Sequence, residues 1–260
     1  MQFDLIKKIV LKIFYAVNEK NYEFKGRTIR YLFKNCKATN LCVVFSAFPQ
    51  QGQMPGYNYV KTLWNRGGYD LIFVCDDMVN IPTGGSYYLG DSGDYWGVDA
   101  VESLLEYVMR KKKYKKIIGV GSSKGGTAAL IFGLKMKFDA IIIGACQYKI
   151  GNYLNCPYHY KTLQELTGMK NVSDEAIDKL NSITKNILIQ NRKTSTEIWF
   201  HYSIKEHTYS EQIKELLQDL RENEYLLHED VSTYLEHNDV AKYFPDFLLK
   251  TLDSLRDNNC

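Results

Sequence analysis

The chain of 260 residues is 45% hydrophobic and 24% charged, with a formal net charge of +3. Such a composition allows a large buried core and excludes disordered, collagen-like and disulfide-stapled proteins. It predicts one domain over residues 1–260. The near balance of 33 basic and 30 acidic side chains argues against nucleic acid as a partner, because such binding rests on an excess of positive charge.

The six cysteines form neither a CxxC pair nor a Cys/His spacing typical of zinc sites. We therefore expect no metal, and reduced thiols in a cytoplasmic protein. The first residues lack the pattern of a secretory signal, which favours the same compartment.

The first predicted element is an amphipathic helix near the N-terminus. Its apolar residues recur at helical spacing: Leu5, Ile6, Ile9, Val10, Ile13, Phe14 and Val17. The longest apolar run, residues 13–17, is far shorter than the roughly 20 residues of a membrane span. Packing of this helix onto the body of the protein is favoured, and binding to a membrane surface stays an alternative.

Short apolar runs then alternate with amphipathic stretches along the chain. Strands are expected at 22–24, 28–33, 41–45, 69–75, 116–120, 139–143, 197–202 and 224–228. Helices are expected at 57–65, 98–110, 124–136, 211–222 and 239–255. This alternation predicts an α/β fold with a mostly parallel central sheet covered by helices on both faces.

The stretch 147–192 is too long for a simple crossover between two strands. It carries helical patterns of its own, with Ser173 as the N-cap of one helix. We expect a helical cap inserted over the carboxyl ends of the strands, where sheets of this kind hold their sites.

The sharpest motif is G-x-S-x-G, formed by Gly121, Ser123 and Gly125 between an apolar strand and a helix. A serine at the apex of such a turn sits in strained backbone with its hydroxyl exposed at a helix N-terminus, as a nucleophile requires. The glycine spacing does not fit a phosphate-binding P-loop, and Lys124 stands where a dinucleotide-binding turn needs its last glycine. An ordinary structural glycine turn stays the alternative.

A serine nucleophile needs a histidine base and an acid, which follow it in chain order in folds of this class. His237 lies in a loop after the last predicted strand and before the final helix, where the base is expected. His201 and His228 fall within strand patterns and are interpreted as packed residues. Glu206 is the one carboxylate directly after the strand 197–202, and we predict that it is the acid.

An oxyanion hole is expected to combine the backbone N–H of Lys124, the residue after the nucleophile, with an N–H from the loop after an early strand. Ala47 is the first choice for that second donor and Phe48 is the alternative. An ordinary strand-exit turn at these residues is not excluded.

Several segments together resemble one protein family. They are FSAFP at 45–49, YNYV at 57–60, GGSYYLG at 84–90, GSSKGGTAAL at 121–130 and HND at 237–239. This combination resembles the bacterial capsule-biosynthesis α/β-hydrolase family, which includes polysaccharide O-acetyltransferases that take acetyl from acetyl-CoA in the cytoplasm. The family acid is usually an aspartate, so Glu206 departs from its pattern.

The resemblance implies an α/β-hydrolase fold, with Ser123 as the acetylated nucleophile and His237 as its base. It implies acetyl-CoA as donor and a polysaccharide or oligosaccharide hydroxyl as acceptor, and it leaves open a peripheral association with capsule-assembly machinery at the membrane. Tyr57, Tyr88 and His207 are candidate substrate contacts, because aromatic faces with polar tips suit sugar rings. The Lys124 side chain either holds a phosphate, of CoA or of a phosphate-containing polymer, or points into solvent.

Two other functions remain open at the level of the sequence. A carbohydrate esterase would use the same triad and differ only in admitting water. A non-catalytic accessory protein of polysaccharide assembly would keep the fold and lose the chemistry.

Overall fold

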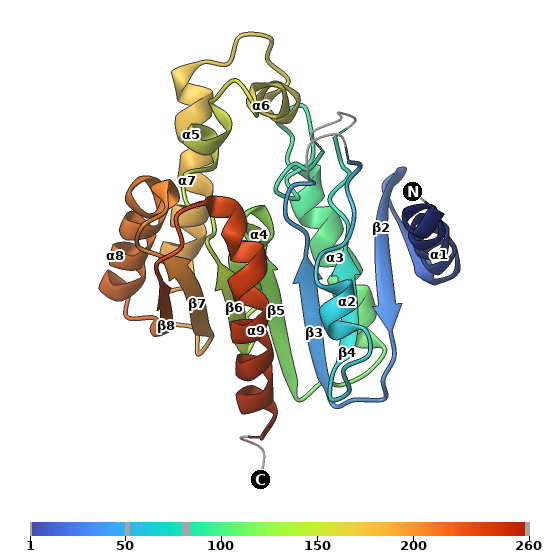
Figure 1. Ribbon diagram of the computed structural model, residues 1–260. Helices are drawn as coiled ribbons and strands as arrows, with labels where there is room; N and C mark the ends of the chain where they lie inside the picture. Colours follow the sequence, from blue (N-terminus) through green and yellow to red (C-terminus); the bar gives the residue numbers. More distant parts are fainter. Residues whose placement is uncertain (1, 50–52, 80–83, 258–260) are drawn as a thin grey trace.

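An eight-stranded sheet runs through the protein (Figure 1). The computed structural model describes residues 2–49, 53–79 and 84–257. The strand order is β1-β2-β4-β3-β5-β6-β7-β8, with β1, β2 and β4 paired antiparallel and every pairing from β4 to β8 parallel. The strands are β1 (Glu19–Phe24), β2 (Arg27–Lys34), β3 (Asn40–Phe45), β4 (Asp70–Val74), β5 (Lys116–Ser122), β6 (Ala140–Gly144), β7 (Glu197–Ser203) and β8 (Leu226–Ser232).

Helices cover both faces of the sheet. They are α1 (Gln2–Asn18), α2 (Val60–Leu63), α3 (Trp96–Arg110), α4 (Lys124–Lys135), α5 (Ile150–Leu154), α6 (Tyr160–Thr167), α7 (Asp174–Gln190), α8 (Lys214–Glu222) and α9 (Val240–Asp257). Side chains alternate along each buried strand, so Val43 joins the core under α3, α4, α7 and α8, while Val44 joins the core under α2 and α9. The same alternation separates Ile141 from Ile142.

Each predicted strand is found within a few residues of its expected place, and the mostly parallel sheet is confirmed. The helix expected at 57–65 is wrong in length, because α2 spans only four residues. Tyr59 lies just before it with a φ of 60°, a left-handed conformation that stops a helix from extending backward. The last strand begins at Leu226 rather than at residue 224, since Glu224 also has a positive φ, of 59°.

The segment 147–192 contains α5, α6 and α7. Figure 1 shows α5 and α6 beyond the ends of β5 and β6, above the N-terminal end of α4. The longer α7 contacts α4 and α8 and so also covers one face of the sheet. The Ser173 side chain accepts a hydrogen bond from the Ala176 N–H, which confirms its expected role as the N-cap of α7.

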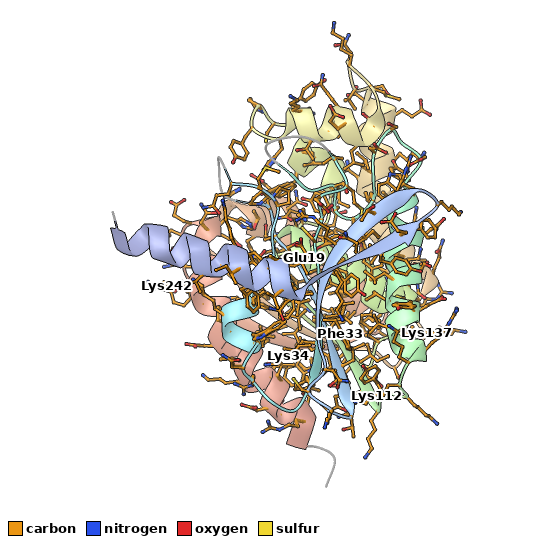
Figure 2. The ribbon with its side chains drawn as sticks, turned by 90° about the vertical axis from the view of Figure 1, so that its right-hand side faces the viewer. Glu19, Phe33, Lys34, Lys112, Lys137 and Lys242 are labelled. Atoms are coloured by element: carbon orange, nitrogen blue, oxygen red, sulfur yellow. The ribbon has the colours of Figure 1, made fainter. Side chains whose placement is uncertain are left out.

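The N-terminal helix packs on the body through one narrow stripe. Phe14 makes an edge contact with Trp64, their ring centroids 4.9 Å apart, and Tyr15 contacts Tyr57 at 5.5 Å. Figure 2 shows α1 running outward from Glu19, past the rest of the molecule in that view. Val10, Ile13 and Val17 were expected to pack and are exposed instead; the side chains of Leu5, Ile6 and Ile9 lie outside the described residues.

In the described part of the chain, no helix is both long and apolar enough to cross a membrane.

Candidate active site

The turn between β5 and α4 holds Ser123 in a strained conformation. Its φ of 52° and ψ of −128° lie in a region that non-glycine residues rarely adopt. The two flanking glycines are required by space: a Cβ on Gly121 would lie 2.1 Å from the Gly125 carbonyl oxygen, and one on Gly125 would lie 2.5 Å from that of Phe45. The motif therefore folds as a sharp elbow that presents the serine hydroxyl at the N-terminus of α4.

Three side chains from distant stretches of the sequence converge at this elbow. The Ser123 Oγ lies 2.9 Å from His237 Nε2, and His237 Nδ1 lies 2.9 Å from Glu206 Oε2. Both spacings are those of hydrogen bonds. The Glu206 side chain is fully buried and that of His237 is 14% exposed, so the pair is shielded from water while the histidine edge stays reachable. The serine, imidazole and carboxylate thus have the arrangement that activates a hydroxyl for attack.

Gln147 is a site residue that the sequence analysis did not single out. Its Nε2 donates a hydrogen bond of 2.9 Å to the Ser123 Oγ and lies 3.4 Å from His237 Nε2. The Tyr87 hydroxyl donates to the Gln147 Oε1 at 3.2 Å, and Thr127 on α4 bonds both backbone groups of Gln147. The amide is therefore fixed with an N–H aimed at the nucleophile. Its position just after β6, the strand beside β5, was the signal that could have revealed it.

Of the three expected oxyanion donors, one already has a hydrogen-bond partner within the protein. Lys124 is the first residue of α4, so its backbone N–H has no hydrogen-bond partner within the helix. The helix dipole favours negative charge at the same place. The Ala47 N–H already donates to Asn58 Oδ1 at 2.9 Å. Because this bond engages the first choice, it favours the alternative donor, Phe48.

The Lys124 side chain neither holds a phosphate nor points into solvent, so both expectations for it are wrong. It is 1% exposed and its Nζ donates to Asp76 Oδ2 at 2.7 Å. The same carboxylate accepts from the Ser86 N–H, the Ser86 hydroxyl and the Tyr88 N–H. The lysine therefore ties the elbow to the loop after β4.

Tyr88 is not available to a substrate, which corrects the expectation that it binds one. The residue is fully buried, and its hydroxyl donates to the Val74 carbonyl at 2.8 Å while it accepts from the Ser46 N–H. Burial raises its pKa well above the usual value of a tyrosine. Tyr88 has a φ of 60°, and this left-handed backbone turns its side chain into the core.

Of the two other candidate contacts, the structure brings one to the triad. The exposed His207 ring lies 6.2 Å from the His237 ring, centroid to centroid. Tyr57 instead packs against α1, and its hydroxyl donates to Glu19 Oε1 at 2.7 Å. Among the described residues, no cluster of three or more His, Cys, Asp or Glu side chains is arranged to hold a metal ion.

No protein-family model and no curated protein sequence matches this chain. Solved structures match over nearly its whole length. The capsule O-acetyltransferase of Neisseria meningitidis serogroup A, in complex with caged gadolinium, superposes with a TM-score of 0.74, covering 92% of this chain and 99% of that one at 18% identity. A histidine variant of that enzyme in complex with CoA gives 0.71 at 19% identity, covering 90% and 94%.

A fluorophosphonate-binding serine hydrolase of Staphylococcus aureus, FphF, also matches, with a TM-score of 0.65 at 12% identity, covering 92% of this chain and 97% of that one. The chain has an α/β-hydrolase fold. This confirms the expected fold class, and the resemblance to capsule O-acetyltransferases holds at the level of the whole fold. Because the α/β-hydrolase fold carries both transferases and hydrolases, the activity must be argued from the site.

Proposed function

We propose that this protein is an O-acetyltransferase that moves acetyl from acetyl-CoA to a hydroxyl of a surface polysaccharide through an acetyl-serine intermediate. The observation that carries the proposal is the chain of two 2.9 Å contacts from Ser123 through His237 to Glu206 at a strained elbow. The fold that this chain shares with a capsule O-acetyltransferase, and the CoA complex of that protein, favour a thioester donor. Acetyl-CoA is a cytoplasmic metabolite, and we place the reaction there.

In the first half-reaction, His237 Nε2 takes the proton of the Ser123 hydroxyl as Oγ attacks the thioester carbonyl carbon. The N–H groups of Lys124 and Phe48 hold the negative oxygen of the tetrahedral intermediate. The carbon–sulfur bond then breaks, and the protonated His237 gives its proton to the departing CoA sulfur. Glu206 holds the imidazole in the right tautomer and stabilises its positive charge.

In the second half-reaction, a sugar hydroxyl takes the place of CoA. His237 removes the hydroxyl proton as the sugar oxygen attacks the acetyl carbonyl carbon. The bond between that carbon and Ser123 Oγ breaks, and the proton returns from His237 to Oγ. The Gln147 N–H, 2.9 Å from Oγ, stabilises this oxygen as it leaves.

A transferase must keep water away from the acetyl-enzyme for longer than the acceptor takes to arrive. We propose that α5 and α6, above the elbow, act as a cap with this role. His159, at the start of α6, stacks against Phe48 with ring centroids 4.8 Å apart, which brings the cap against the proposed oxyanion loop.

The test is transfer of acetyl from acetyl-CoA to oligosaccharides prepared from the source organism's own surface polysaccharide after mild alkaline removal of O-acetyl groups. We expect Ser123→Ala to lower the transfer rate by more than about 10³-fold, since the nucleophile is removed. Ser182→Ala is the control, because this half-buried serine on α7 donates a hydrogen bond to the Lys179 carbonyl of its own helix. Full transfer by Ser123→Ala would refute the acetyl-serine mechanism.

A carbohydrate esterase with the same triad is the second candidate, favoured by the fold shared with the serine hydrolase FphF. The two activities differ in the effect of the acceptor. A transferase consumes acetyl-CoA faster when the oligosaccharide is added. For an esterase, the rate of acetyl-CoA consumption does not depend on the oligosaccharide.

A further inference from the structure

A cavity of about 590 Å³ opens beside the triad, between α5, α6 and the turn that follows β7. Its volume is in the range of about 300–1,000 Å³ in which proteins bind small organic molecules. Tyr153, Tyr158 and His159 line it from the cap, and His207 and Glu211 line it from the other side. His207 directly follows Glu206 and lies next to the His237 ring, so one wall of the cavity adjoins the catalytic groups.

His159 lines this cavity and has no place in the triad. It is 8% exposed and surrounded by rings, with centroid distances of 4.7 Å to Tyr158, 4.8 Å to Phe48 and 5.2 Å to Tyr153. Its Nδ1 is buried without a hydrogen-bond partner among the described residues. Leaving a buried polar atom unpaired is costly, and His159 is one of the residues that line the cavity, so the unpaired Nδ1 points to a bound molecule that pairs with this ring.

The charges around the cavity disfavour an anionic occupant. Lys149 is the one lysine or arginine that lines it in the described part of the chain, and Glu215 neutralises this charge at 2.8 Å, while Glu211 adds a carboxylate to the lining. Burial, with a smaller effect of His237, lowers the pKa of His159 to about 4, so its ring is neutral at physiological pH. A sugar ring has apolar faces that pack on tyrosine rings and hydroxyl groups that hydrogen-bond to a neutral imidazole. The phosphates of CoA would instead need positively charged donors.

We propose that this cavity is the acceptor subsite, in which Tyr153, Tyr158 and His159 bind an uncharged sugar ring and His159 Nδ1 pairs with one of its hydroxyls. This assignment rests on the proposed transferase function and adds the acceptor's chemical class and place. A sugar held there presents a neighbouring hydroxyl to His237 and to the acetyl group on Ser123.

The direct test measures binding in a protein that cannot react. The dissociation constant of the same de-O-acetylated oligosaccharides is measured by calorimetry for Ser123→Ala and for Ser123→Ala combined with His159→Phe. Phenylalanine keeps the ring stacking and removes Nδ1, so we expect affinity to fall about tenfold, the effect of one hydrogen bond. Combining Ser123→Ala with His228→Phe is the control, because His228 also stacks on an aromatic ring, that of Trp199, but lies on β8. Unchanged affinity in the His159 variant, or no binding at all, would overturn the proposal.

A second measurement separates this proposal from the proposed function. Single-turnover formation of acetyl-Ser123 is followed in His159→Phe and in Tyr158→Ala without acceptor, and the acetyl-enzyme is then mixed with the oligosaccharides. We expect the acceptor step to slow by tenfold or more while acetylation slows far less. An equal loss in both steps would assign the cavity to the donor and contradict the acceptor assignment. Absence of acetyl-enzyme in the parent protein would refute the transferase, yet the calorimetry would still report whether the cavity binds the sugar.

Discussion

At the scale of single residues, the reactivity of Ser123 depends on two contacts that meet at its Oγ. His237 Nε2 accepts the hydroxyl proton, and Gln147 Nε2 donates a hydrogen bond to the same oxygen from another side. A donor in this position stabilises negative charge on the oxygen both when it attacks and when it leaves the acetyl group. Tyr87 holds the amide in the orientation that makes this contact.

We expect Gln147→Leu to slow acetylation of Ser123 by about tenfold, the equivalent of one lost hydrogen bond. The measurement is single-turnover release of CoA, with circular dichroism to confirm folding of the variant. Gln218→Leu is the matched control, because Gln218 bonds only to Glu222 on the exposed side of α8. A Gln147→Leu enzyme as fast as the parent would show that the amide has no part in catalysis.

Some of the site residues could be predicted from the sequence and others could not. Ser123, His237 and Glu206 could be named because the spacing of the glycines and the order of the triad residues along the chain can both be read from the sequence. The direction in which a side chain points cannot. Lys124 turns inward to Asp76, and Tyr88 turns inward from left-handed backbone. Gln147 was missed because no motif marks which residue after a strand points at the neighbouring elbow.

At the scale of elements, a buried ion pair holds the elbow against the loop after β4. Lys124 and Asp76 are each 1% exposed, and Asp76 also receives three hydrogen bonds from Ser86 and Tyr88. The Lys124 backbone N–H is a proposed oxyanion donor, so the salt bridge fixes the residue that carries it. Removing one partner of such a pair leaves an uncompensated charge in the interior.

Lys124→Met is therefore expected to lower the free energy of unfolding by about 3–5 kcal/mol. Urea denaturation measures this loss. Lys135→Met is the control on the same helix: that lysine pairs with Glu102, but both side chains are partly exposed, and its loss is expected to cost about 1 kcal/mol or less. Equal losses in the two variants would contradict a special structural role for the buried pair.

The elements themselves were largely predictable. Strands such as β3 and β6 are continuous apolar runs buried on both faces, and this pattern is strong even in a single sequence. The lengths of short helices were not predictable, because α2 can begin only after Tyr59, whose backbone is left-handed, and the residue type tyrosine does not indicate this conformation. The start of α8 follows a π-helical turn at Tyr209–Ile213, which hydrophobic periodicity does not resolve either.

At the scale of the whole molecule, the described side chains of α1 pack on the body of the protein through a narrow stripe. Its packed stripe passes through Phe14, Tyr15 and Asn18, and this leaves Val10, Ile13 and Val17 exposed. Of the predicted apolar face, Phe14 contacts the body of the protein, whereas Val10, Ile13 and Val17 are exposed. The rest of the fold therefore does not depend on these three side chains.

Replacing Val10, Ile13 and Val17 with serine is expected to change the free energy of unfolding by no more than about 0.5 kcal/mol per site, the usual effect of surface substitutions. Phe14→Ala is expected to cost more, about 1–3 kcal/mol, because it removes the ring that packs on Trp64. Thermal and urea unfolding compare the variants. A triple variant less stable than Phe14→Ala would mean that the exposed face is buried in solution by a contact with another surface.

The most direct measurement of the central claim is the mass of the intact protein after brief exposure to acetyl-CoA without acceptor, followed by mapping of the modified peptide. We expect a gain of one acetyl group located on Ser123, its absence in Ser123→Ala, and its loss when the de-O-acetylated oligosaccharides are added. An unmodified Ser123 in a protein that still transfers acetyl, or an acetyl group on another residue that the oligosaccharides remove, would contradict the claim.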